Sequence, residues 1–177
     1  DASPYGHMKG FHGQFGVFVR TLSYMMSMGA DGLAQAASDA VLSANYILAG
    51  LSDDLTLSYE GPCMHEVLFD DRFLAETEVT TLDFAKAMID EGVHPMTMYF
   101  PLVVHGALLM EPTETESLAS LDQYIGMVKS LARRAKQGEV AAFKEAPRLA
   151  PRRRLDETTA ARNPVLRWLP GDKAAAE

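Results

Sequence analysis

Histidines are the residues of this sequence whose side chains most readily do acid–base or metal chemistry near neutral pH. The sequence has five of them: His7, His12, His65, His94 and His105. Their positions show no close metal-ligand spacing, and no two of them lie four residues apart on a predicted helix. A glycine-rich phosphate loop between a strand and a helix is also missing. The pattern therefore predicts no metal site and no dinucleotide site.

The stretch GFHGQFG, residues 10–16, is the first candidate for a binding loop. It holds three glycines and leads directly into a predicted helix. The backbone amides of His12, Gly13 and Gln14, together with the start of that helix, could face an anion. The alternative is a tight turn whose only role is to begin the helix. The residues themselves leave both interpretations open.

His94 and Glu111 are the other polar residues at informative positions. His94 lies between Val93 and Pro95, immediately before a predicted strand, where a purely structural histidine is a full alternative to a functional one. Glu111 ends a second predicted strand and is followed by Pro112. That glutamate could equally be an exposed strand end, an ion-pair partner or the N-terminal acid of a helix.

Composition limits the class of protein. The chain has 177 residues, of which 47% are hydrophobic and 23% charged, which predicts one or two small globular units. A net charge of −8 argues against nucleic acid or an anionic membrane as the main partner. One cysteine excludes an internal disulfide framework. No apolar run reaches the roughly 18 residues that a membrane span needs.

Three segments follow from the patterning. Residues 1–54 contain two predicted helices over 14–51, which are separated at Gly29. Each helix has a wide apolar stripe, and more protein would be needed to cover these stripes. Residues 55–137 alternate strand and helix in the order β-α-β-β-α, which is typical of a small α/β sandwich. Thr80 and Asp83 are spaced as a capping box, and Gly92 follows the end of that helix.

The last helix of this segment should begin after the run EPTETES, residues 111–117. Thr113 with Glu116, or Ser117, could cap it. Its predicted inward face is Leu118, Leu121, Ile125, Val128 and Leu131. Residues 138–177 lose periodicity and contain four prolines, so we expect an extended tail that proteases cut first between Glu139 and Arg154.

Several strings in this order resemble one known family. GPCMHEVLF (61–69) and VTTLDFAKAMIDEGVHPMTMYFPLVVHGALLMEPTETESLASLD (79–122) are similar to the C-terminal part of the P-protein of the glycine cleavage system. GFHGQFGVFVRTLSYMMSMGADGL, AVLSANYILAGL and LDETTAARNPVLRW resemble further stretches of that family. LDETTAARNPVLRW is similar to the tail of subunit 2 in the two-subunit prokaryotic form, and YFPL before EPTETES resembles that form too.

The resemblance implies a fold and a reaction. The fold would be the C-terminal small domain of a pyridoxal-phosphate-dependent transferase of the aspartate-aminotransferase type, preceded by two long helices. The complete enzyme would be a glycine dehydrogenase that decarboxylates glycine and passes the aminomethyl group to the lipoyl arm of H-protein. Its partners would be P-protein subunit 1 and lipoylated H-protein, and its location cytoplasmic.

The resemblance also says where the chemistry should lie. The family's Schiff-base lysine follows a histidine directly, and no His-Lys pair occurs here; Lys9 lies too close to the helix start to match it. We therefore expect that lysine upstream, with pyridoxal phosphate not held covalently by this segment. His94 and Thr97, and His12, Gly13 and Gln14, are the pocket candidates. The alternative function is a truncated, non-catalytic module that only pairs with a partner.

Overall fold

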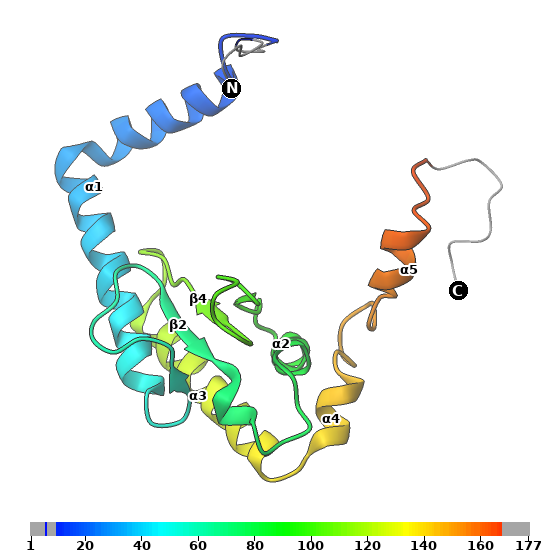
Figure 1. The fold of residues 1–177 in the computed structure, drawn as a ribbon. Helices are drawn as coiled ribbons and strands as arrows, with labels where there is room; N and C mark the ends of the chain where they lie inside the picture. The colour runs from blue at the N-terminus through cyan, green and yellow to red at the C-terminus, as the bar shows by residue number, and fades with distance from the viewer. Residues whose placement is uncertain (1–5, 7–9, 168–177) are drawn as a thin grey trace.

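The computed structural model describes residue 6 and residues 10–167. Its elements, shown in Figure 1, are α1 (Phe15–Leu51), β1 (Thr56–Leu57), β2 (Val67–Asp70), the 3-10 helix η1 (Asp71–Leu74), α2 (Thr81–Asp90), β3 (Thr97–Met98), β4 (Leu108–Met110), α3 (Leu118–Lys136), α4 (Val140–Glu145) and α5 (Glu157–Arg162). The predicted β-α-β-β-α order is therefore confirmed by β2, α2, β3, β4 and α3. The patterning missed β1, η1 and the two short C-terminal helices.

The sheet is small and antiparallel, with the strand order β1-β2-β4-β3. Val67 pairs with Met110 and Phe69 with Leu108, so four buried apolar side chains share one face. Leu68 and Leu109 face each other on the other side and are only half-buried. The first face packs against the helices, which makes one hydrophobic core between the sheet and the helical layer.

Helix α1 is two helices joined at a kink. Gly29 has φ 65° and ψ 179°, values that a residue with a side chain rarely adopts, so the predicted break at this glycine is confirmed. The C-terminal half buries Ala44, Ile47 and Leu51 against the core. The N-terminal half extends away from the sheet (Figure 1) and leaves its apolar side chains exposed.

That exposed stripe leads to a testable expectation. Leu22 is 58% and Met26 76% exposed, one helical turn apart on α1. Burial of apolar surface stabilises contacts by roughly 25 cal/mol per Å², so the 177-residue chain should self-associate through this stripe. Leu22→Glu with Met26→Glu should shift sedimentation toward the monomer. Ser23→Glu with Ser27→Glu adds the same charge at polar positions and should not. Monomeric wild-type protein at high concentration would contradict the expectation.

Helix α2 begins with the predicted capping box. The Thr80 hydroxyl accepts a hydrogen bond from the Asp83 amide at 3.2 Å, and the Asp83 carboxylate accepts one from the Thr80 amide at 3.0 Å. Helix α2 packs against both α3 and α4. Phe84 and Ala87 are therefore buried as well as Ala85 and Met88.

The EPTETES run ends at the cap of α3. The Ser117 hydroxyl accepts a hydrogen bond from the Ser120 amide at 3.1 Å, so Ser117, one of the two predicted alternatives, is the N-cap. The predicted inward face of α3 is confirmed at Leu121, Val128 and Leu131, which are buried, but not at Leu118. Leu118 is 62% exposed, whereas Ala132 and Ala135 are buried. Small residues allow α3 to approach its neighbours closely at this end.

The structure corrects the expectation of an extended tail from residue 138. Residues Val140–Glu145 form α4, and Phe143 and Ala146 are fully buried. Arg154 then donates hydrogen bonds to the carbonyl oxygens of Phe143 and Ala146, both at 2.8 Å. One turn and a half of helix is too short to produce a recognisable period, which is why the sequence pattern did not reveal it. The predicted first cleavage between Glu139 and Arg154 is unfavourable in a segment packed in this way.

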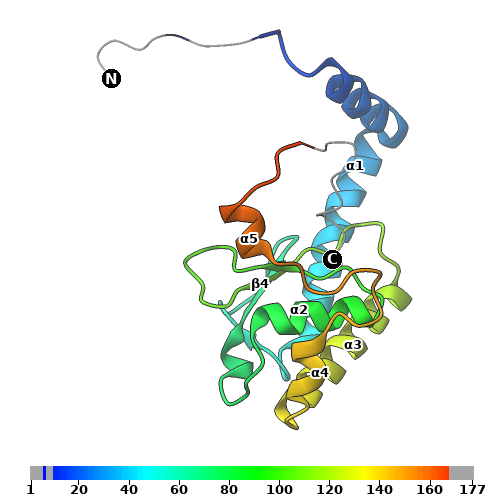
Figure 2. The same cartoon turned by 90° about the vertical axis from the view of Figure 1, so that its right-hand side faces the viewer.

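Beyond this point the chain lies on the surface. All residues from 151 to 167 are exposed, including Leu155, Val165 and Leu166. Figure 1 shows α5 standing apart from the sheet and the other helices, and in Figure 2, seen from that side, α5 lies toward the viewer. Trp168 lies outside the described residues. Across the described part of the chain, no helix has the length and apolar character that crossing a membrane requires.

Candidate functional site

A groove of about 630 Å³ opens where α1, the α2–β3 loop, β4 and α3 meet. His94 and Thr97, the two candidates in the small domain, both line it. Its apolar base includes Ile47, Met96, Met110 and Leu121, all buried. Its polar rim includes the exposed His94, Thr97, Glu111, Glu116 and Ser120. An apolar base with a few polar side chains around it is the usual form of a small-molecule site.

Local structure explains why His94 and Thr97 lie on this rim. Gly92 has φ 79° and turns the chain at the end of α2, and the Val93 amide donates a hydrogen bond to the Met88 carbonyl at 3.2 Å. Met96 is buried and Thr97 pairs with Leu109 in the sheet. The residues between the turn and the strand are thus held at both ends, and His94 and Thr97 remain accessible.

The groove also contains groups that were not among the predicted pocket residues. Burial raises the pKa of the Tyr124 phenol well above its ordinary value, so this hydroxyl stays protonated and can donate a hydrogen bond. Glu111 and Glu116 bring two carboxyl groups to the rim. Tyr124 lies in a regular helix and carried no local signal. Glu111 was noticeable in the sequence because it follows a predicted strand. A structural role explains that position equally well, however.

The groove can therefore recognise some ligands better than others. Imidazole, hydroxyl, phenol and carboxyl groups can bind a cationic or neutral polar group by hydrogen bonds. Among residues 10–167, no lysine or arginine lines the groove. Its charge is thus unfavourable for an anion such as a phosphate group.

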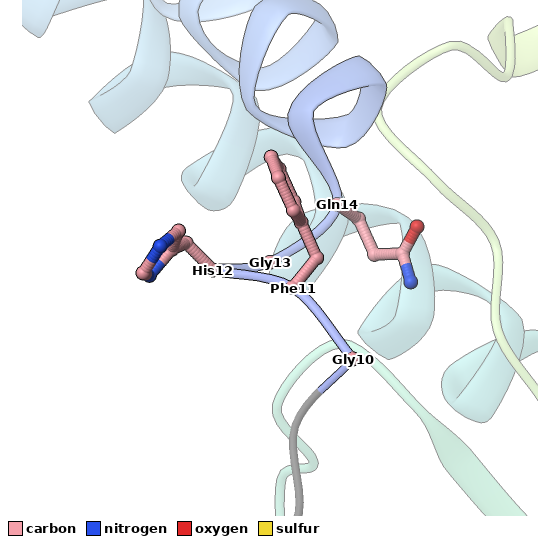
Figure 3. A pocket seen from close by; sticks show the side chains of 5 residues that line it. All are labelled: Gly10, Phe11, His12, Gly13 and Gln14. Carbon is pink, nitrogen blue, oxygen red and sulfur yellow. The ribbon is translucent and has the colours of Figure 1, made fainter.

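The other three candidates lie in a separate hollow of about 470 Å³ at the start of α1, formed by the consecutive residues 10–14. In Figure 3 the side chains of His12 and Gln14 point away from each other, with Phe11 between them. Gly13 has φ 136°, and a Cβ atom there would lie 2.5 Å from the Phe18 ring, so this turn requires glycine. Gln14 makes no side-chain cap bond. All five residues are exposed.

The structure does not bring the two groups of candidates together. His12, Gly13 and Gln14 immediately precede α1, whose start lies far from the sheet (Figure 1), whereas His94 precedes β3 and Thr97 belongs to it. Within this chain they belong to two different cavities. A common site would require additional protein between them.

Pyridoxal phosphate, the cofactor implied by the resemblance, can be tested against these cavities. It needs a lysine amine and a phosphate cradle. The lysines between residues 10 and 167 are Lys86, Lys129, Lys136 and Lys144, and none lines either cavity. Lys144 is paired with Asp83, and Lys129 with Asp54. Lys9 lies outside the described residues. The described residues therefore do not fit this cofactor as its covalent site.

These features define a class of protein: a small α/β domain with an antiparallel sheet. It forms a groove with a polar rim, and none of its described lysines lines that groove. Comparison with known proteins makes the class specific. Residues 36–151 match the family described as "Glycine dehydrogenase, C-terminal domain". The match covers more than half of the chain, and the chain belongs to this family.

Relatives extend the similarity over nearly the whole chain. The "Probable glycine dehydrogenase (decarboxylating) subunit 2" of Caulobacter vibrioides is 64% identical over 167 residues, which are 94% of this chain and 32% of that protein. Proteins of the same name from Kosmotoga olearia and Thermotoga maritima are 45% and 43% identical over 95% and 92% of the chain. The chain thus spans about a third of the length of these relatives.

Proposed function

We propose that this chain is the C-terminal part of glycine dehydrogenase (decarboxylating) subunit 2, the P-protein of the glycine cleavage system. In this proposal the complete enzyme decarboxylates glycine and passes the aminomethyl group to the lipoyl arm of H-protein, in the cytoplasm and together with subunit 1. The observation that carries the proposal is the 64% identity to a protein of that name over 94% of the chain. No comparison favours the alternative of a non-catalytic interaction module.

The fold and the cofactor belong to the same proposal. We infer the small domain of a pyridoxal-phosphate transferase fold, with the cofactor held by the part of the relatives that this chain does not cover. The lining of the groove, as far as the described residues show it, holds no lysine or arginine, which supports that division. When bound, the cofactor acts as an electron sink for decarboxylation. This chain would contribute side chains that bind and orient: His94 as a hydrogen-bond donor and Thr97 through its hydroxyl.

A chimera tests the proposed function. In the Caulobacter vibrioides relative, the C-terminal third is replaced by this chain and combined with subunit 1 and H-protein. Lipoyl-dependent release of carbon dioxide from glycine is then measured. We expect activity close to that of the parent enzyme, because the replaced segment is 64% identical. A chimera that folds and assembles but releases no carbon dioxide would contradict the proposal.

The same chimera tests the site residues. His94→Gln and Thr97→Val should each lower the rate at least about tenfold, or roughly 1.4 kcal/mol of transition-state stabilisation, without a change in melting temperature. His105→Gln is the matched control, because His105 is an exposed histidine outside the groove. Full activity in both variants, or activity lost only in proportion to stability, would assign them a structural role.

A further inference from the structure

His65, Glu66 and Glu111 form a cluster that the proposed reaction does not use. One ligand atom from each of them lies within 4.8 Å of the others. The sequence pattern could not show this cluster, because Glu111 is far along the chain from the other two residues. The strand register brings them together. Val67 pairs with Met110, so Glu66 and Glu111 stand next to each other just beyond the last pair of β2 and β4.

The backbone around all three residues is held by the fold. Glu66 immediately precedes β2, and Glu111 follows β4 and is itself followed by the buried Pro112. His65 lies two residues after Cys63, which is clamped to α1. The Asn45 side chain donates to the Cys63 carbonyl at 2.7 Å and accepts from the Cys63 amide at 3.1 Å. The cluster is therefore not three side chains that meet by chance on mobile loops.

The donor groups of this cluster suit a cation. Two carboxylates at facing positions of neighbouring antiparallel strands repel each other. Glu66 and Glu111 take part in none of the ion pairs found among residues 10–167. A bound cation would remove this repulsion. One imidazole nitrogen with two carboxylate oxygens is a donor set that suits zinc and its first-row neighbours, rather than the all-oxygen set typical of magnesium and calcium.

We propose that His65, Glu66 and Glu111 bind a first-row divalent cation, with zinc as the best match. Three protein ligands leave a fourth coordination position for water or another molecule. Glu111 also lines the groove that contains His94 and Thr97. The cation therefore lies at the edge of that groove, where it can attract an oxygen or nitrogen atom of a molecule bound there. The proposal depends only on this chain and does not require the proposed reaction.

Titration calorimetry of the metal-free 177-residue chain with zinc chloride tests it. We expect saturable binding of one ion per chain and a rise in melting temperature, because an ion that binds only the folded state stabilises it. His65→Ala and Glu111→Gln should each weaken binding at least about tenfold, which corresponds to roughly 1.4 kcal/mol. Magnesium at the same concentrations should bind far more weakly. Circular dichroism checks that each variant is folded.

Two control variants separate this site from incidental zinc binding. His105→Gln removes an exposed histidine elsewhere, and Cys63→Ser removes the only thiol of the chain. Both should bind zinc as the wild type does. Absence of saturable binding in the wild type would overturn the proposal. The proposal would also be overturned if Cys63→Ser lost zinc binding while Glu111→Gln kept it. Glutamine keeps the size of the glutamate side chain and removes only its charge, so Glu111→Gln tests the carboxylate as a ligand.

Discussion

Replacing Phe143 by alanine should lower the free energy of unfolding by about 3–4 kcal/mol, the usual cost of removing a fully buried aromatic side chain. Phe143 is completely inaccessible to solvent. Its ring stacks on Phe84 of α2, with 6.3 Å between the centroids, and the Arg134 guanidinium of α3 lies 5.8 Å from the ring centre. A six-residue helix thus joins two larger ones, and its removal leaves a cavity that neither can fill.

Urea unfolding followed by circular dichroism measures this effect. Leu149→Ala is the matched control, because Leu149 belongs to the same segment but is 81% exposed. That variant should stay within about 0.5 kcal/mol of wild type. If the two variants were equally stable, residues 138–154 would not be packed against the core, and the extended arm predicted from the sequence pattern would be correct.

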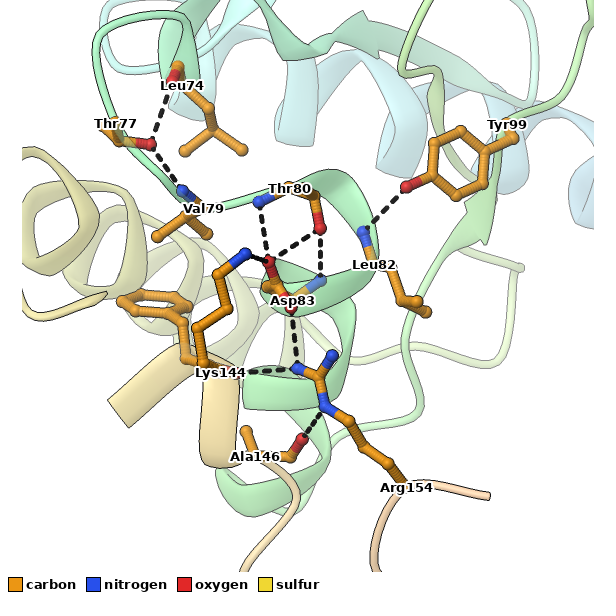
Figure 4. Close-up of polar contacts among 11 residues, drawn as sticks. Leu74, Thr77, Val79, Thr80, Leu82, Asp83, Tyr99, Lys144, Ala146 and Arg154 are labelled. Carbon is orange, nitrogen blue, oxygen red and sulfur yellow. Dashed lines mark hydrogen bonds and ion pairs between the residues drawn. The ribbon is translucent and has the colours of Figure 1, made fainter. Parts of the chain in front are cut away.

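Replacing Asp83 by asparagine should cost about 2 kcal/mol at neutral pH. The Asp83 carboxylate is nearly buried and receives Lys144 at 2.6 Å and Arg154 at 2.8 Å, in addition to its bonds to Thr80 (Figure 4). Asparagine is isosteric but uncharged. It would leave the two cations of the C-terminal segment without their counterion. Asp53→Asn, an exposed position, is the control and should change stability little.

The pH dependence of this difference identifies its cause. Burial by itself would raise the pKa of Asp83, but hydrogen bonds from Lys144, Thr80 and Arg154 outweigh burial and lower the pKa to about 2. A depressed carboxyl pKa stabilises the folded state above the unfolded pKa, and this contribution disappears as the pH falls through the folded value. Lys144 is about half exposed, so solvent screening reduces the contribution to at most about 2 kcal/mol.

Unfolding free energies of wild type and Asp83→Asn should therefore differ most above about pH 4 and converge as the pH falls toward 2. A difference that stays constant over this range would mean that the variant acts through packing or the helix cap. The two cations would then make no net contribution.

These contacts connect stability to the candidate site. The C-terminal segment holds α2 at both ends. Asp83 at its start receives Lys144 and Arg154, and Asp90 at its end accepts backbone hydrogen bonds from Arg148 and Leu149 at 2.7 Å. The chain turns directly from the end of α2 into the loop that carries His94. Release of the segment should therefore disturb the groove as well as the global stability.

Local sequence determined the elements whose signals are short-range. The capping box of Thr80 and Asp83, the break at Gly29 and the cap at Ser117 each depend on residues within a few positions, so they were predictable. The strands of β2, β3 and β4 and the long helices followed from apolar runs and periodicity in the same way. The family resemblance rested on rare strings in a fixed order, which the comparisons confirm.

Tertiary structure decided what depends on contacts between distant residues. Six residues of α4 have no measurable period, and only the pocket between α2 and α3 makes Phe143 a core residue. Strand register alone places Glu111 beside His65 and Glu66, and helix packing alone buries the Tyr124 phenol and raises its pKa. His94 and Thr97 were chosen as candidates from their place at a strand entry and from the family resemblance, but their shared groove exists only because four separate elements meet there. The periodicity of a sequence indicates which face of one helix or strand is apolar. To predict a site, one must also know which helices and strands pack next to each other, and periodicity does not contain that information.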